Sequence, residues 1–189
     1  MTFMHPYATI TKQNELRGDF MEIWDAYLSD GTKAGKDLIR GEEIPKGLYH
    51  LVCEIIVRHE DGDYLLMQRD PRKPNFGGMF EATAGGSALK GETPLTCAKR
   101  ELTEETGIIP LSLEGISVFV SHNTIYHNFL AITDCDKANI LLQEGETVSF
   151  KWLNEQDFIK FVNSDEMIAA QRKRYLPYLN KMGYIHTSP

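Results

Sequence analysis

The sequence predicts a mixed α/β fold in which a sheet lies between helices. Three observations carry this expectation: short apolar runs typical of buried strands, a strongly marked helix in mid-chain, and a helical pattern after residue 155. The 189 residues suit one domain with terminal elaborations, and 42% of them are hydrophobic, which is enough for a core. We therefore expect an N-terminal extension at residues 1–19 and a single domain at residues 20–189, with its core at about residues 47–160.

The expected strands are separated by turn residues. Asp30-Gly31 turns a hairpin within residues 20–41, and Asp61-Gly62 joins a buried strand to its partner. Helices are expected from Glu155 to the C-terminus, with a second one beginning near Asp165 despite Pro177. The core strands are expected at residues 47–58, 64–68, 116–121, 126–133 and 147–153.

The central helix has a clear beginning and end. Thr93 suits the N-cap, and Gly107 suits the left-handed residue that terminates a helix. Leu95, Ala98 and Leu102 lie close together at about 100° per residue, so they predict an apolar stripe that faces the core.

The same helix carries three carboxylates on one face. Glu101, Glu104 and Glu105 are spaced i, i+3 and i+4, and like charges at these spacings weaken a helix by roughly 0.2–0.5 kcal/mol per pair. A divalent cation is the simplest way to offset this repulsion. Hard cations such as Mg²⁺ prefer oxygen ligands, and a phosphate-bearing ligand can complete their coordination.

Residues 86–108 resemble the Nudix box, whose pattern is G-x5-E-x7-R-E-U-x-E-E-x-G-U with U apolar. This resemblance implies a Nudix-type α/β/α sandwich with a mixed β-sheet, an N-terminal hairpin and C-terminal helices. It also implies a pyrophosphohydrolase that cleaves a diphosphate linkage in a nucleoside diphosphate derivative or a related organic diphosphate, with Mg²⁺ or Mn²⁺ as cofactor. The matching positions are Gly86, Glu92, Arg100, Glu101, Leu102, Glu104, Glu105, Gly107 and Ile108.

By this resemblance, the metal ligands are Glu101, Glu104, Glu105 and the main-chain carbonyl of Gly86 or its neighbour Gly85. Glycine lets the backbone approach an ion closely. Glu104 and Glu101 are also the expected catalytic carboxylates. Which glutamate deprotonates the attacking water, and how many ions bind, stays open.

Arg100 is expected to act with the catalytic carboxylates as an orienting group that pairs with Glu92. Substrate binding is expected from Arg69, Lys73 and Phe80, which lie in or beside the loop before the box. A guanidinium suits a phosphate because it can donate two parallel hydrogen bonds.

Several residues keep two interpretations. Glu144 and Glu146 could supply a further acid to the site, or they could form a solvated acidic turn. Phe76, Tyr126 and Phe129 could stack on a nucleobase, although aromatic residues near strands are more often part of the core.

A weaker resemblance over residues 20–155 points to the Nudix subgroup that is similar to isopentenyl-diphosphate isomerase. Isomerase activity is therefore an alternative, but it requires a cysteine just before the box, and residues 82–86 contain none. A non-catalytic sensor of a nucleotide metabolite is a second alternative. Such a sensor usually has a DNA-binding domain or a degenerate box, and neither is evident here.

Composition limits the other possibilities. The net charge of −7 argues against nucleic-acid binding, and no apolar run reaches the roughly 20 residues of a membrane span. We expect a cytoplasmic protein whose partner is a small diphosphate, with a homodimer left open. Cys53 and Cys97 are expected to be buried core residues.

Overall fold

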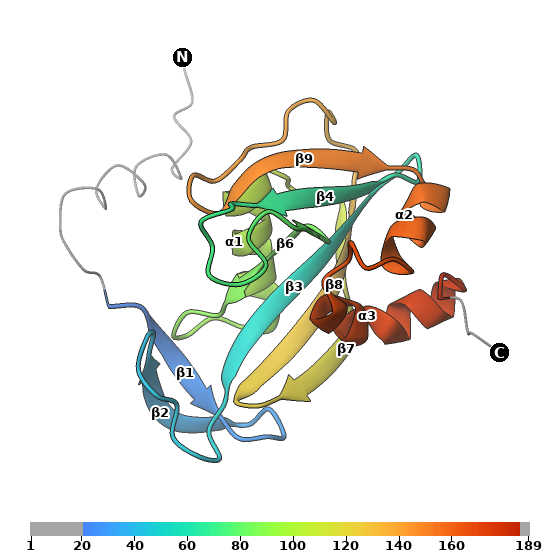
Figure 1. Cartoon of the computed structure of the whole chain (residues 1–189). Helices are drawn as coiled ribbons and strands as arrows, with labels where there is room; N and C mark the ends of the chain where they lie inside the picture. The colour runs from blue at the N-terminus through green and yellow to red at the C-terminus, as the bar shows by residue number, and fades with distance from the viewer. Residues whose placement is uncertain (1–20, 186–189) are drawn as a thin grey trace.

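The computed structural model describes residues 21–185, so the extension predicted at residues 1–19 lies outside the described residues. It contains a two-stranded hairpin, a seven-stranded sheet and three helices (Figure 1). The elements are β1 (Ile23–Tyr27), β2 (Lys33–Ile39), β3 (His50–His59), β4 (Tyr64–Arg69), β5 (Phe80–Glu81), β6 (Ala84–Ser87), α1 (Pro94–Thr106), β7 (Ser112–Ser121), β8 (Thr124–Thr133), β9 (Thr147–Leu153), α2 (Glu155–Val162) and α3 (Ala169–Met182).

The large sheet is mixed, as the sequence predicts. Its main order is β5-β4-β3-β8-β7, with β6 paired to β3 and β9 paired to β4. β3 and β8 run parallel over their whole length, from His50 opposite Thr124 to His59 opposite Thr133. The other strand pairs are antiparallel, including the predicted hairpin β1–β2.

β3 and β4 diverge after their turn, and a later segment enters the gap. The two strands pair directly only at Arg58 and Tyr64. Beyond that point β6 pairs with β3, and β5 pairs with β4. Thr83 lies between these two short strands and is fully buried. Its backbone is in the left-handed conformation, with φ of 71°. Its hydroxyl donates to the Leu65 carbonyl at 2.7 Å and accepts from the Val57 N–H at 3.2 Å, so it bridges the diverging strands.

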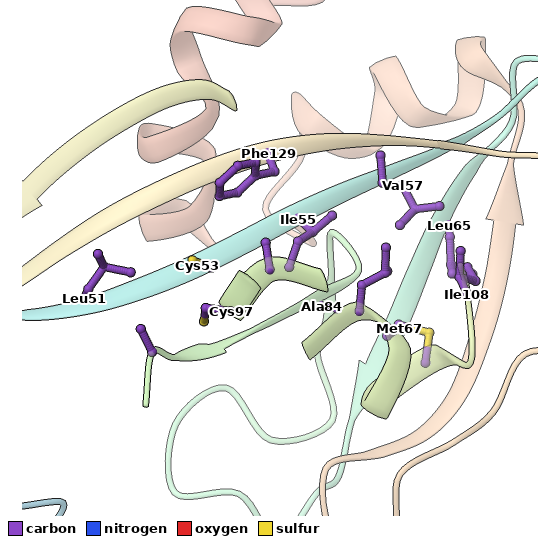
Figure 2. Packing of buried hydrophobic residues seen from close by; sticks show 14 of the residues in the cluster. Leu51, Cys53, Ile55, Val57, Leu65, Met67, Ala84, Cys97, Ile108 and Phe129 are labelled. Carbon is purple, nitrogen blue, oxygen red and sulfur yellow. The ribbon is translucent and has the colours of Figure 1, made fainter. Parts of the chain in front are cut away.

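Helices cover the two faces of the sheet, which gives the predicted three-layer arrangement (Figure 1). The α1-side core is largely aliphatic, and Figure 2 shows Ile55, Val57 and Leu65 within it. The predicted burial of Cys53 and Cys97 is confirmed, since both thiols lie fully buried in this core. The opposite core, beneath α2 and α3, is rich in tyrosine and phenylalanine.

Helix α1 begins and ends as the sequence predicts, with Thr93 as its N-cap and a left-handed Gly107 after its last turn. The predicted apolar stripe is wrong at Leu95, which is 41% exposed. Leu95 belongs to the first turn, whereas the buried face is centred near Ala98 and Glu105. The acidic face therefore overlaps the buried face of the helix at Glu105.

Other boundaries shift for local reasons. Helix α3 begins at Ala169 and not near Asp165, because the chain turns after α2 and the Ser164 hydroxyl accepts the Glu166 N–H. Pro177 lies inside α3, as predicted. Within residues 21–185 we find no helix with the length and apolar character needed to cross a bilayer.

Candidate active site

A cavity of about 750 Å³ opens between the ends of the hairpin and α1. Four segments form its wall: the two ends of the hairpin, β6 with the loop that follows it, the acidic face of α1, and the loop before β9. Carboxylates outnumber cationic side chains five to three in this wall. The lining residues are Met21, Glu22, Ile23, Arg40, Gly85, Gly86, Ser87, Leu89, Lys90, Arg100, Glu101, Glu104, Glu105, Gln143 and Glu146.

Arg100 connects the carboxylates of the box. Its Nε and Nη2 donate to the two oxygens of Glu92 at 2.7 and 2.8 Å, and Nη2 also donates to the Ser87 carbonyl at 3.1 Å. Its Nη1 donates to Glu101 at 2.7 Å and to Glu104 at 3.1 Å. The expected pairing with Glu92 is present and bidentate, which is the strong geometry for this pair. Arg100 therefore fixes β6, the loop after it and the acidic face of α1 relative to one another.

These contacts perturb the titration of the neighbouring carboxyls. Burial alone would raise the pKa of Glu92, but the Arg100 guanidinium and the Leu89 N–H hold it below its ordinary value. Burial raises the pKa of Glu101 despite the opposing charge of Arg100, and the nearby Glu104 and Glu92 raise it further. A second cation beside Glu101 would stabilise its charged form.

Glu105 is the most deeply placed of the three helix carboxylates, with 7% exposure. Burial raises its pKa well above the ordinary value, and the charges of Glu101, Glu81 and Glu146 act in the same direction. Within residues 21–185 its carboxylate accepts one hydrogen bond, a long one from the Gly85 N–H at 3.4 Å. A buried carboxyl among like charges is stabilised by a cation, so this position favours a metal ligand.

The residues present fit a hard divalent cation. The side-chain ligands on this side of the cavity are the carboxylates of Glu101, Glu104 and Glu105, and the backbone of Gly85 and Gly86 lies beside them. The Gly86 carbonyl also accepts the Cys97 thiol at 3.7 Å. At Gly86 a Cβ atom would lie 2.3 Å from Glu101 Oε1, so any other residue would require that carboxylate to move. Residues 21–185 contain no preformed group of three ligating side chains, which is consistent with the hydrogen bonds from Arg100 to Glu101 and Glu104.

The predicted substrate contacts do not gather at this cavity. Arg69 is paired with Glu81 at 2.8 Å, outside the lining residues. Phe80 packs on the tyrosine-rich core, where the Lys151 ammonium lies 4.0 Å from its ring centroid. Lys73 does not line the cavity either, but it forms an ion pair with Glu146, which does.

The structure shows which of the residues with two interpretations lie at the cavity. Glu146 lines the cavity, whereas its neighbour Glu144 does not. None of the aromatic candidates lies there: Phe129 belongs to the α1-side core, Tyr126 lies beneath the Arg174 guanidinium, and Phe76 is half-exposed in its loop.

Sequence reasoning missed the contribution of the hairpin. Glu22, Arg40, Lys90 and Gln143 line the cavity, but no periodicity or spacing relates them to the box. The one available signal was the resemblance of residues 20–50 to a subgroup lead-in, which did not indicate that the segment faces the acidic helix.

The three-layer fold and the arginine-linked carboxylates on its central helix define a hydrolase of the Nudix type. A family model described as the NUDIX domain matches residues 48–179, and the chain belongs to this family. An uncharacterized Nudix hydrolase of Listeria monocytogenes is 31% identical over 151 residues, covering 78% of this chain and 89% of that protein.

Two further comparisons extend along most of the chain. The ADP-ribose pyrophosphatase of Bacillus subtilis is 27% identical over 182 residues, covering 90% of this chain and 91% of that protein. A crystal structure of DR0079 from Deinococcus radiodurans superposes with a TM-score of 0.61 at 17% identity, covering 75% of this chain and 88% of that chain. The second likeness concerns the fold alone.

Proposed function

We propose that this Nudix hydrolase catalyses the metal-dependent hydrolysis of a diphosphate linkage in a nucleoside diphosphate derivative. The observation that carries the proposal is the position of three box carboxylates, Glu101, Glu104 and Glu105, along one wall of the cavity. A diphosphate is a poor electrophile, because its anionic oxygens repel an incoming nucleophile. The same oxygens would also be repelled by a cavity wall in which carboxylates predominate, unless a cation is bound.

Glu101, Glu104, Glu105 and the carbonyl of Gly86 are the proposed holders of Mg²⁺ or Mn²⁺. When bound, the ion supplies charge neutralisation at the phosphate oxygens and lowers the pKa of water. Glu104 is the most exposed of the three carboxylates, at 51% of its side chain, so it can also meet water at the cavity mouth.

The roles of this chain's other groups follow from their contacts. Arg100 retains two bonds to Glu92 and one to Ser87 even when Glu101 and Glu104 turn towards a ligand, so it orients the acidic face without leaving its place. Either Glu104 or Glu101 is the proposed proton acceptor for the attacking water. Lys73 can meet a substrate phosphate only if its ion pair with Glu146 opens.

The likeness to the Bacillus subtilis enzyme makes ADP-ribose the first substrate to test. No aromatic side chain among residues 21–185 lines the cavity, so charge and hydrogen bonding, not stacking, would provide recognition on this wall. The diphosphate is therefore the best-defined part of the proposed substrate.

The test is hydrolysis by purified protein with Mg²⁺, using ADP-ribose, other nucleoside diphosphate derivatives and prenyl diphosphates. Glu104→Gln and Glu105→Gln should each lower kcat by roughly two or more orders of magnitude, the scale expected for loss of a metal ligand or a general base. Full activity in both variants, or an absence of turnover on every diphosphate, would contradict the proposal.

The same experiment separates the alternatives. An allylic product formed from isopentenyl diphosphate without hydrolysis would indicate the isomerase, although residues 82–86 contain no cysteine for that chemistry. Tight binding of a nucleotide without turnover would indicate a sensor.

A further inference from the structure

We propose that Arg40 is a specificity-determining residue that binds the substrate diphosphate from the side of the cavity opposite the acidic helix. This inference rests on the proposed diphosphate hydrolysis and assigns a substrate contact to the hairpin, which lies outside the box. Arg40 lines the cavity directly after β2, together with Glu22 and Ile23 at the start of the hairpin.

The backbone of this wall is held in place. The Ile23 carbonyl accepts the Lys90 N–H at 2.8 Å, and the Asp25 carboxylate accepts the Gly91 N–H at 2.8 Å. The Arg40 N–H donates to the Glu22 carbonyl at 3.0 Å. The hairpin is thus bonded to the loop that leads into α1, and Arg40 is set at a defined position relative to the box.

The side chain of Arg40, in contrast, is free to exchange partners. It is 64% exposed, and within residues 21–185 its guanidinium makes one hydrogen bond, from Nη1 to Glu22 Oε2 at 2.5 Å. The other oxygen of Glu22 accepts the Trp24 indole N–H at 2.8 Å. If Arg40 exchanges Glu22 for a phosphate, the Glu22 carboxylate still accepts the hydrogen bond from Trp24.

The two other cations of the cavity are less suited to this role. Arg100 already forms ion pairs with the box carboxylates Glu92, Glu101 and Glu104. Lys90 pairs at 2.6 Å with Asp37, which lies outside the cavity lining and so draws the ammonium away from it. The charge of Arg40 instead interacts with Glu101 and Glu146 across the cavity.

The chemistry favours exchange of Glu22 for phosphate. A guanidinium donates two parallel hydrogen bonds to a phosphate, and the pair is stronger than a neutral hydrogen bond. Metal held on the acidic helix would neutralise one side of a bridging diphosphate, while Arg40 would meet oxygens on the other side. Substrates that lack a second charged phosphate should gain nothing from Arg40.

The test compares the wild-type chain with Arg40→Ala, Arg40→Lys and the matched control Lys36→Ala. Lys36 is an exposed cation on the same hairpin and does not line the cavity. Two quantities are measured with Mg²⁺: the Kd for methylenediphosphonate, a diphosphate that resists hydrolysis, by calorimetry, and kcat and KM for ADP-ribose.

We expect Arg40→Ala to raise Kd and KM by about tenfold or more, the scale of one lost hydrogen bond to a charged group, with a smaller change in kcat. Arg40→Lys should recover part of the affinity, and Lys36→Ala should match the wild type. Glu22→Gln should bind more tightly than the wild type, because it weakens the competing ion pair. A purely structural ion pair would instead make Glu22→Gln and Arg40→Ala equivalent in thermal unfolding and leave Kd unaltered.

The outcomes separate this inference from the proposed function. If the wild type hydrolyses a diphosphate and Arg40→Ala has the wild-type Kd and KM, the role of Arg40 is wrong and the function stands. If the wild type binds methylenediphosphonate through Arg40 but hydrolyses no diphosphate, the function is wrong and the binding role stands. A wild-type protein that does not bind methylenediphosphonate overturns the inference.

Discussion

The two sides of the cavity are built in different ways. On the box side, Glu105 is buried and Arg100 makes five hydrogen bonds to Glu92, Glu101, Glu104 and the Ser87 carbonyl. On the hairpin side, the Arg40 side chain is largely exposed and pairs with one residue of the described chain, Glu22. The backbone is anchored on both sides, so the difference lies in how firmly the side chains are held.

Under the proposed function, this difference would separate two tasks within one cavity: chemistry on phosphorus and recognition of the substrate. Chemistry on phosphorus needs charged groups held at fixed positions before the substrate arrives, because reorganisation would cost free energy at the transition state. Recognition of different diphosphates tolerates a side chain that exchanges partners. Substitutions on the box side should therefore alter kcat and stability, and those on the hairpin side should alter affinity.

Removal of the guanidinium on the box side should produce the largest effect. Arg100→Ala leaves Glu92, Glu101 and Glu104 without their shared partner, and we expect a loss of about 3 kcal/mol of unfolding free energy. Chemical denaturation measures it. Arg100→Lys should recover only part of this, since an ammonium cannot reproduce the bidentate contact. Equal stability of all three proteins would mean that the box side is not held by Arg100.

A single methyl group at Gly86 tests how closely β6 and the acidic helix must approach. In Gly86→Ala the new Cβ would lie 2.3 Å from a Glu101 oxygen, so that carboxylate has to move. We expect kcat to fall about a hundredfold, the scale for misplaced catalytic groups. Gly115→Ala in β7 is the control, because no atom lies within 4 Å of its new Cβ. Similar kcat values for both variants would contradict the close fit.

The pH dependence of stability without metal tests the burial of Glu105. Its pKa is raised above the ordinary 4.5, so the folded chain binds this proton more tightly than the unfolded chain. The stabilisation is present below about pH 4.5 and is lost as the pH rises through the raised pKa. At pH 7 in a chelator, Glu105→Gln should raise Tm, on the order of a few degrees. Added Mg²⁺ should then stabilise the wild type more than the variant, and a lower Tm for Glu105→Gln in the chelator would count against this account.

The sequence predicted the order of elements and the box helix well, because the signals are local. Thr93, Gly107 and the i, i+3, i+4 carboxylates each lie within a few residues of the feature that they define. The expected substrate contacts Arg69 and Phe80 do not line the cavity, because they were chosen for their nearness to the box in the chain. In the folded protein Glu81 and Lys151 neighbour them instead. Arg40 lines the same cavity as the box carboxylates only because of tertiary packing, which no local pattern encodes.

The divergence of β3 and β4, which Thr83 bridges, has a consequence for how the protein folds. β3 and β4 are consecutive and could pair along their full length, yet they diverge and receive β5 and β6 between them. The backbone N–H and C=O groups on the facing edges of β3 and β4 lack their β6 and β5 partners until residues 80–87 are in place. We therefore expect the β3–β4 hairpin alone to be a poor folding nucleus. The same arrival brings Gly85 and Gly86 to the acidic helix. Under the proposed function, a partly folded chain would therefore lack the assembled metal-binding carboxylates, and the capacity for hydrolysis would be acquired only with the complete core.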